Sequence, residues 1–173
     1  QWVRDLIEDR KVGRIGDEAA GRLLDDAIPL AIRMQEQAGL DFISDGEWRR
    51  ESYVKVFAEA VGGFDNDVVR DHSSSISNIG YPAVVSQLTP RRPMAVGEAK
   101  FLRDRTSAGT LVAVPSPYTV ARRMWSLDHS RAAYPDRDVF MEACIPIIRA
   151  EVQALLELGV DAVQLDDPWL ALL

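Results

Sequence analysis

The stretch Leu158-Gly-Val-Asp-Ala-Val-Gln-Leu-Asp-Asp-Pro168 combines a helix end, a buried strand and two acidic residues. Gly159 is placed to end the helix in a left-handed conformation. Val160–Leu165 is short and apolar, as expected for a strand buried inside a parallel sheet. Because α/β proteins place their functional residues after the carboxyl ends of such strands, this stretch predicts an α/β fold with chemistry at that edge.

A second copy of the same design, Ala38-Gly-Leu-Asp-Phe-Ile-Ser-Asp-Gly-Glu47, lies upstream. Gly39 and Asp41 align with Gly159 and Asp161, and an apolar segment follows in both copies. Acidic residues follow the strand in each copy as well. Two helix-to-strand units of this kind are expected to deliver carboxylates to one rim of the fold.

Helices alternate with short apolar strands along the chain, which favours parallel strands covered by outer helices. The chain has 173 residues, whereas a complete (β/α)8 barrel takes about 250. We therefore expect residues 1–173 to form one partial TIM-barrel domain. The predicted strands are 40–44, 110–114 and 160–165, and an inserted hairpin is predicted from 82–88 and 93–96, after a polar surface excursion over 65–80.

Two long helices carry an interior proline. One begins near Asp17, contains Pro29 and ends at Gly39; the other begins at Asp136 and contains Pro146. Because proline cannot donate a backbone hydrogen bond, each helix is expected to kink or split at that point.

Composition excludes several classes of function. The net charge of −7 and the pI near 4.9 argue against nucleic acid or an anionic membrane as a partner. A single cysteine excludes a disulfide framework within the chain. No apolar run reaches the roughly 18–20 residues of a membrane span, and Gln1–Asp5 shows no secretory signal. A cytoplasmic protein is the resulting expectation.

Glu47 and Asp166 are the acidic residues that we single out as a candidate site. Carboxylates that converge on one opening can bind an amine, orient a hydroxyl group, hold a metal or act as acid and base. Capping the next helix, or pairing with Arg49 or Arg50, is the alternative. Asp45 and Asp167 are expected to make structural hydrogen bonds, because strand alternation turns them away from the other acids.

A zinc site is not expected from these residues alone. The sequence contains no His-x-Cys, Cys-x-x-Cys or His-Glu-x-x-His motif. Cys144 lies on the apolar face of a predicted helix, and His72 and His129 lie in polar loops without partners at ligand spacing.

Four stretches in order resemble the catalytic barrel of cobalamin-independent methionine synthase, and the short, single-barrel relatives most closely. The resemblance spans roughly residues 20–168. The stretches are Gly39-Leu-Asp-Phe-Ile-Ser-Asp-Gly-Glu47, Pro115-Ser-Pro-Tyr-Thr119, Ala132-Ala-Tyr-Pro-Asp-Arg137 and Gln164-Leu-Asp-Asp-Pro168.

The resemblance implies methyl transfer from a methylated folate to the thiol of homocysteine, which a zinc ion activates as a thiolate. It implies that Glu47 and Asp166 bind the amino group of homocysteine, and Trp125 is the nearest counterpart of a tryptophan that stacks on the folate. The family's zinc ligands follow the Gln-x-Asp-x-Pro motif and would lie outside these 173 residues, as would the first barrel strand. A second chain or further segment would then complete the barrel, and the fragment alone is expected to be inactive.

Two alternatives remain at this stage. The same scaffold could alkylate or cleave coenzyme M-type thioethers through a zinc thiolate, in which case Glu47 and Asp166 need not bind an amino acid. The chain could also be a non-catalytic half-barrel that only shapes a partner's pocket.

Overall fold

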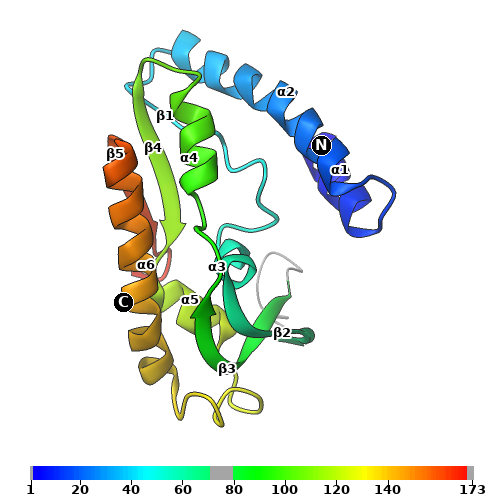
Figure 1. The fold of residues 1–173 in the computed structure, drawn as a ribbon, viewed down its shortest axis with the longest axis vertical. Helices are drawn as coiled ribbons and strands as arrows, with labels where there is room; N and C mark the ends of the chain where they lie inside the picture. The colour runs from blue at the N-terminus through cyan, green and yellow to red at the C-terminus, as the bar shows by residue number, and fades with distance from the viewer. Residues whose placement is uncertain (1, 71–79, 171–173) are drawn as a thin grey trace.

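The computed structural model describes residues 2–70 and 80–170, which form helices packed around two small sheets (Figure 1). The elements in order are α1 (Trp2–Lys11), α2 (Asp17–Gln37), β1 (Phe42–Ile43), α3 (Lys55–Ala60), β2 (Val61–Arg70), β3 (Tyr81–Pro90), α4 (Val96–Arg103), β4 (Gly109–Pro115), α5 (Pro117–Met124), α6 (Arg137–Leu158) and β5 (Ala162–Asp166).

The larger sheet is parallel and has the strand order β1-β4-β5. Phe42 pairs with Gly109 at one side of β4, and on the other side the β4–β5 register runs from Leu111 with Ala162 to Pro115 with Asp166. The predicted α/β class with parallel strands is therefore confirmed. Since all three strands run the same way, their carboxyl ends lie at one edge of the sheet.

The two aligned glycines behave as the sequence repeat predicts. Gly39 and Gly159 follow α2 and α6 with φ of 75° and 86°, a left-handed conformation that favours glycine. After each glycine the chain turns into a strand of the parallel sheet.

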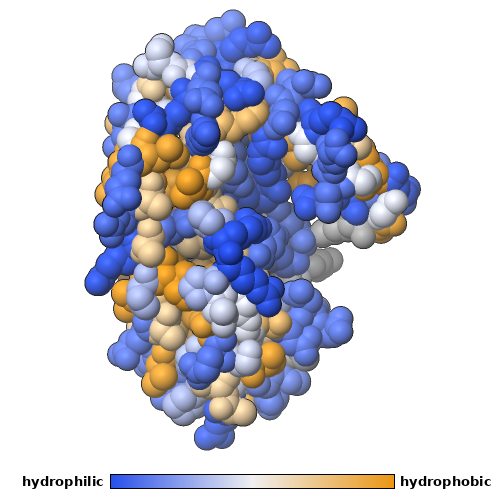
Figure 2. Space-filling view, in the orientation of Figure 1, coloured by the Kyte–Doolittle hydropathy of each residue, from blue (hydrophilic) through white to orange (hydrophobic). Residues whose placement is uncertain are grey.

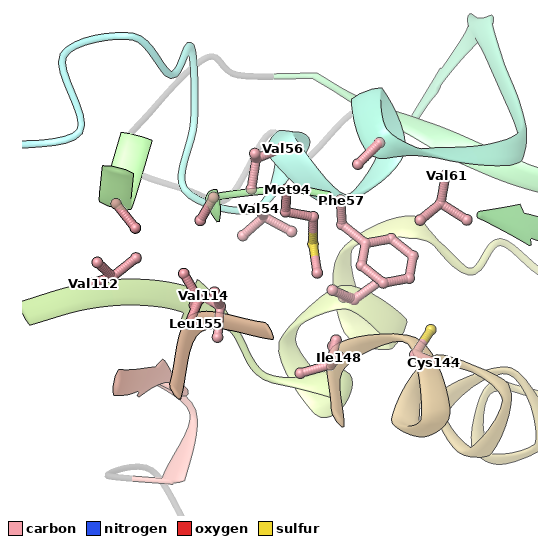
Figure 3. Packing of buried hydrophobic residues seen from close by; sticks show 14 of the residues in the cluster. Val54, Val56, Phe57, Val61, Met94, Val112, Val114, Cys144, Ile148 and Leu155 are labelled. Atoms are coloured by element: carbon pink, nitrogen blue, oxygen red, sulfur yellow. The ribbon is translucent and has the colours of Figure 1, made fainter. Parts of the chain in front are cut away.

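Buried side chains from α3, β4 and α6 meet in the core (Figure 3). Phe57 of α3 and Ile148 of α6 are almost fully buried, and Val114 of β4 is equally inaccessible. Cys144 is also part of this apolar cluster, as the sequence predicted. At about 25 cal/mol per Å² of apolar surface, such burial is the main force that holds the helices against the sheet.

The interior prolines do not split their helices. α2 runs without interruption through Pro29, and α6 runs through Pro146. In α2 the residues around Pro29 include Ile28 and Ile32, which are buried. Tertiary packing of that face compensates for the hydrogen bond that proline cannot donate. Neither helix is split at its proline, and the kink stays a prediction.

A hairpin is present, but one of its strands was predicted wrongly. β3 pairs antiparallel with β2, from Val61 opposite Pro90 to Arg70 opposite Tyr81, with register shifts along the ladder. Residues 93–96 form no strand; Met94 and Ala95 are buried just before α4. Residues 65–70, predicted to be a surface excursion, belong to β2, and residues 71–79 of that excursion lie outside the described part of the chain.

α1 and the adjoining end of α2 stand out from the rest of the molecule, as the space-filling view shows (Figure 2). α1 packs against α2, and Leu6 of α1 and Leu24 of α2 are both buried. The opposite end of α2 leads into β1 and so reaches the parallel sheet.

Candidate functional site

The loops that follow β1, β4 and β5 lie at the carboxyl edge of the parallel sheet. The ladder between β4 and β5 continues one step beyond the strands, because the Ser116 N–H donates to the Asp166 carbonyl oxygen at 3.1 Å. Glu47 belongs to the loop after β1 and Asp166 ends β5. The shared rim that the sequence predicted is therefore present.

Glu47 adopts a left-handed backbone conformation with φ of 56°, the only non-glycine residue at positive φ among those described. The Glu47 N–H donates to Asp45 Oδ1 at 2.9 Å, and the Arg50 N–H donates to the Glu47 carbonyl oxygen at 3.0 Å. A glutamate in this region of φ/ψ space is strained by about 1–3 kcal/mol, and such strain clusters at functional sites.

The side chain of Glu47 lies in an acidic environment and is 30% exposed. Burial raises the pKa of the Glu47 carboxyl; Arg50 opposes this shift, whereas Asp166 and Asp45 add to it. Asp166 is therefore among the charged groups that influence the Glu47 carboxyl. Arg50 Nη1 lies 3.6 Å from Glu47 Oε2, so this ion pair is loose and leaves the carboxylate partly accessible.

Two adjacent cavities open at this rim. The smaller, of about 210 Å³, is lined by both charged and apolar groups, and the larger, of about 510 Å³, is open to solvent. Gln164 lines both cavities and donates from Nε2 to Asp166 Oδ1 at 2.6 Å. The smaller cavity includes Asp45, Glu47, Arg50 and Glu98 among its lining residues; the larger includes Tyr53, Asp166, Asp167 and Pro168.

Asp45 and Asp167 make structural hydrogen bonds. Asp167 accepts from Ser116 Oγ at 2.9 Å and from Thr119 Oγ1 at 3.4 Å, and thereby fixes the start of α5, whose N-cap is Ser116. Asp45 is 7% exposed and accepts from Glu47, while its Oδ2 is buried with no hydrogen-bond partner in the described part of the chain. Both residues thus hold the rim loops in shape.

Trp125 lines neither cavity. Its indole Nε1–H donates to the Tyr134 carbonyl oxygen at 3.1 Å, and its half-buried ring packs against the core. The structure does not bring Trp125 together with Glu47 and Asp166, and its binding role stays a prediction.

Sequence reasoning missed Glu98. This residue of α4 pairs with Arg50, Nη2 to Oε2 at 2.7 Å, although the two lie 48 positions apart. Arg49, the neighbouring arginine, instead forms an ion pair with Asp25 of α2. No periodicity or motif links Arg50 to Glu98, so the sequence carried no signal for this pair.

The described residues contain no group of three or more His, Cys, Asp or Glu side chains that could hold a metal ion. Cys144 is buried in the apolar core, and desolvation raises the pKa of its thiol far above the ordinary value. His129 is exposed in a loop, and His72 lies outside the described residues. The donor set visible here therefore does not fit a tetrahedral zinc ion.

Within the described ranges, the helices are all too short or too polar to cross a lipid bilayer.

Comparison with known proteins identifies relatives along the whole chain. The chain is 31% identical to a methionine synthase of Sulfurisphaera tokodaii over 170 residues, which cover 97% of this chain and 48% of that protein. It is 30% identical to a methionine synthase of Saccharolobus solfataricus over 172 residues, or 98% of this chain and 50% of the relative. The chain thus spans about half the length of the curated relatives it matches.

A solved structure of a related protein has a similar fold. The B12-independent methionine synthase of Shewanella sp. W3-18-1, in complex with selenomethionine, superposes with a TM-score of 0.77 at 28% identity, covering 89% of this chain and 44% of that chain. This similarity confirms the partial (β/α)8 barrel. Because residues 1–173 also match the family described as "Cobalamin-independent synthase, Catalytic domain", the chain belongs to the cobalamin-independent methionine synthase family.

Proposed function

We propose that this chain forms part of the catalytic barrel of an enzyme that transfers a methyl group to the thiol of homocysteine in methionine biosynthesis. Its family membership supports this reaction class. A methylated folate is the methyl donor that we propose.

In this proposal Glu47 and Asp166 bind the amino group of homocysteine. The observation that supports it best is that Glu47 combines a strained backbone with a partly accessible carboxylate, in a loop at the same edge of the sheet as Asp166. Two carboxylates near one ammonium form charge-assisted hydrogen bonds, which are about twice as strong as neutral ones. The amino group would thus orient the substrate and leave its thiol free for the transfer.

The remainder of the barrel would supply the missing strands and the zinc ligands. We propose that residues 1–173 are one partial-barrel domain, completed by further polypeptide on the same chain or on a second chain. Zinc ligands would come from that remainder, since the donor set described above does not fit the ion. For the folate we retain Trp125 as the proposed stacking surface.

Substitution of the two acids in the completed barrel tests this function. Glu47→Gln and Asp166→Asn preserve side-chain shape but remove the charges that face the ammonium. Each should weaken homocysteine binding by about 10- to 100-fold, corresponding to the roughly 1.5–3 kcal/mol of a hydrogen bond to a charged group, as measured by isothermal titration calorimetry.

Glu142→Gln provides the matched control, because Glu142 is exposed on α6 away from both cavities. Its affinity for homocysteine should equal that of the unmodified protein. If Glu47→Gln and Asp166→Asn bound homocysteine as tightly as this control, the proposed role of both acids would be wrong, and a thiol substrate without an amino group would be favoured.

A further inference from the structure

We propose that Arg50, held by Glu98, is a positioning residue that fixes the Glu47 carboxylate for binding of the substrate's ammonium group. This inference rests on the proposed function, because it assumes that Glu47 binds that group. It assigns a role to two residues that do not themselves need to touch the substrate.

Three nitrogen atoms of the Arg50 guanidinium are held by two partners. Nε and Nη2 lie 2.8 and 2.7 Å from Glu98 Oε2, and Nη1 donates to the Ala113 carbonyl oxygen of β4 at 2.9 Å. Only 3% of the Arg50 side chain and 14% of the Glu98 side chain are exposed. These contacts join the β1 loop to α4 and to the central strand, so the guanidinium has a fixed place.

Glu47 is held by the same residue through both backbone and side chain. The backbone N–H of Arg50 closes the turn onto the Glu47 carbonyl oxygen, and Nη1 of Arg50 lies 3.6 Å from Glu47 Oε2. The short contacts of Arg50 go to Glu98 and Ala113, and the long one goes to Glu47. Arg50 therefore aligns the Glu47 carboxylate without saturating it, and the carboxylate can still accept hydrogen bonds from an ammonium.

Glu98 controls how much of the Arg50 charge reaches Glu47. The charged groups that act on Glu47 are Arg50, Asp166 and Asp45, and Glu98 and Glu47 repel each other as like charges; Arg50 alone among these four favours the ionised Glu47 carboxylate. While Glu98 accepts from Arg50, the guanidinium is shared between two carboxylates. Loss of Arg50 should raise the pKa of Glu47, and loss of the Glu98 charge should leave more of the guanidinium for Glu47 and lower that pKa.

A buried ion pair is not by itself evidence of a stabilising role, because desolvation offsets much of its attraction. Lysine could not reproduce the contacts of Arg50, because a single ammonium cannot present the planar fork that reaches Glu98, Ala113 and Glu47 together. If the Arg50–Glu98 pair is purely structural, its removal should change stability but not the pH dependence of homocysteine binding. If the pair positions Glu47, its removal should also change that pH dependence.

The test compares Arg50→Gln, Glu98→Gln and Arg50→Lys in the completed barrel. Homocysteine affinity is measured by calorimetry across the acid side of the pH profile, where binding falls as Glu47 is protonated. We expect Arg50→Gln to shift this fall to higher pH and Glu98→Gln to shift it to lower pH. Arg50→Lys should keep the midpoint near its original pH but weaken binding about tenfold, the lower end of the effect of losing a hydrogen bond to a charged group.

Arg49→Gln is the matched control, since Arg49 lies in the same loop but pairs with Asp25 and should shift nothing. Circular dichroism checks that each variant is folded. If Arg50→Gln does not fold, the direction in which Glu98→Gln shifts the pH midpoint of binding decides the test. The inference is overturned if Glu98→Gln leaves the midpoint unchanged or shifts it upward while Glu47→Gln still abolishes tight binding. If Glu47→Gln itself has no effect, the proposed function fails first and the inference with it.

Discussion

At the scale of single residues, Glu47 combines the two properties expected of a functional position. Its backbone is left-handed, and its carboxyl lies among other acids at the carboxyl edge of the parallel sheet. Neither property favours folding. Such residues persist when the surrounding structure holds them, and here the Asp45 side chain and the Arg50 backbone do so.

The backbone strain can be separated from the chemistry by comparing Glu47→Gly with Glu47→Ala. Both remove the carboxylate, and both should lose homocysteine binding. Because glycine adopts φ of 56° without a Cβ clash, Glu47→Gly should be more stable than Glu47→Ala by about 1 kcal/mol in urea unfolding. Equal stability of the two variants would show that the left-handed conformation carries no strain.

The sequence predicted Glu47 and Asp166 because each follows a buried strand in a repeated helix-to-strand design, and the structure places both at one rim. The sequence indicates Arg50 only as an ion-pair partner of the strand-end acids, and it carries no signal for Glu98. Their pairing depends on how α4 packs beside the β1 loop, which is a tertiary contact without a local sequence pattern.

At the scale of elements, Glu151 shows how one buried acid can organise a neighbouring helix. It lies on α6 and is 6% exposed; its two oxygens accept from the N–H groups of Met94 and Ala95 at 2.9 and 2.7 Å. These residues immediately precede α4. The acid thus holds the start of α4 against α6 and places Glu98 in the first turn where it meets Arg50.

Removal of this contact should destabilise the protein. Glu151→Ala leaves two buried N–H groups without an acceptor, at about 1–3 kcal/mol for each unsatisfied group, so a loss of roughly 2–6 kcal/mol is expected in urea unfolding. Glu142→Ala, at an exposed position of the same helix, should change stability by less than about 0.5 kcal/mol. A Glu151→Ala protein as stable as that control would contradict the assigned role.

The same contact explains why the hairpin was only partly predicted. Residues 93–96 are short and apolar, which resembles a strand, but the backbone N–H groups of Met94 and Ala95 donate to Glu151 instead of a neighbouring strand. The true partner, β2, is rich in glycine and acidic residues and has an irregular register. Its strand pairing follows from tertiary packing, which outweighs weak local propensity.

At the scale of the whole molecule, the predictable part was the alternation of helices with parallel strands, because hydrophobic patterning and glycine stops determine it. Apolar side chains such as Leu156 of α6 and Leu165 of β5 remain exposed, and apolar patches interrupt the polar surface in Figure 2. A barrel segment is expected to expose such residues, since in a complete barrel further strands and helices would cover them.

The most direct measurement is the affinity of the completed barrel for L-homocysteine and for its analogue without the amino group, 4-mercaptobutanoate. The unmodified protein should bind L-homocysteine at least about tenfold more tightly than 4-mercaptobutanoate. Glu47→Gln should lose most of this preference, because the carboxylate that it removes interacts only with the ammonium group of homocysteine. Equal affinity of the unmodified protein for both thiols, or an unchanged preference in Glu47→Gln, would contradict the assignment of Glu47 and Asp166 to the amino group.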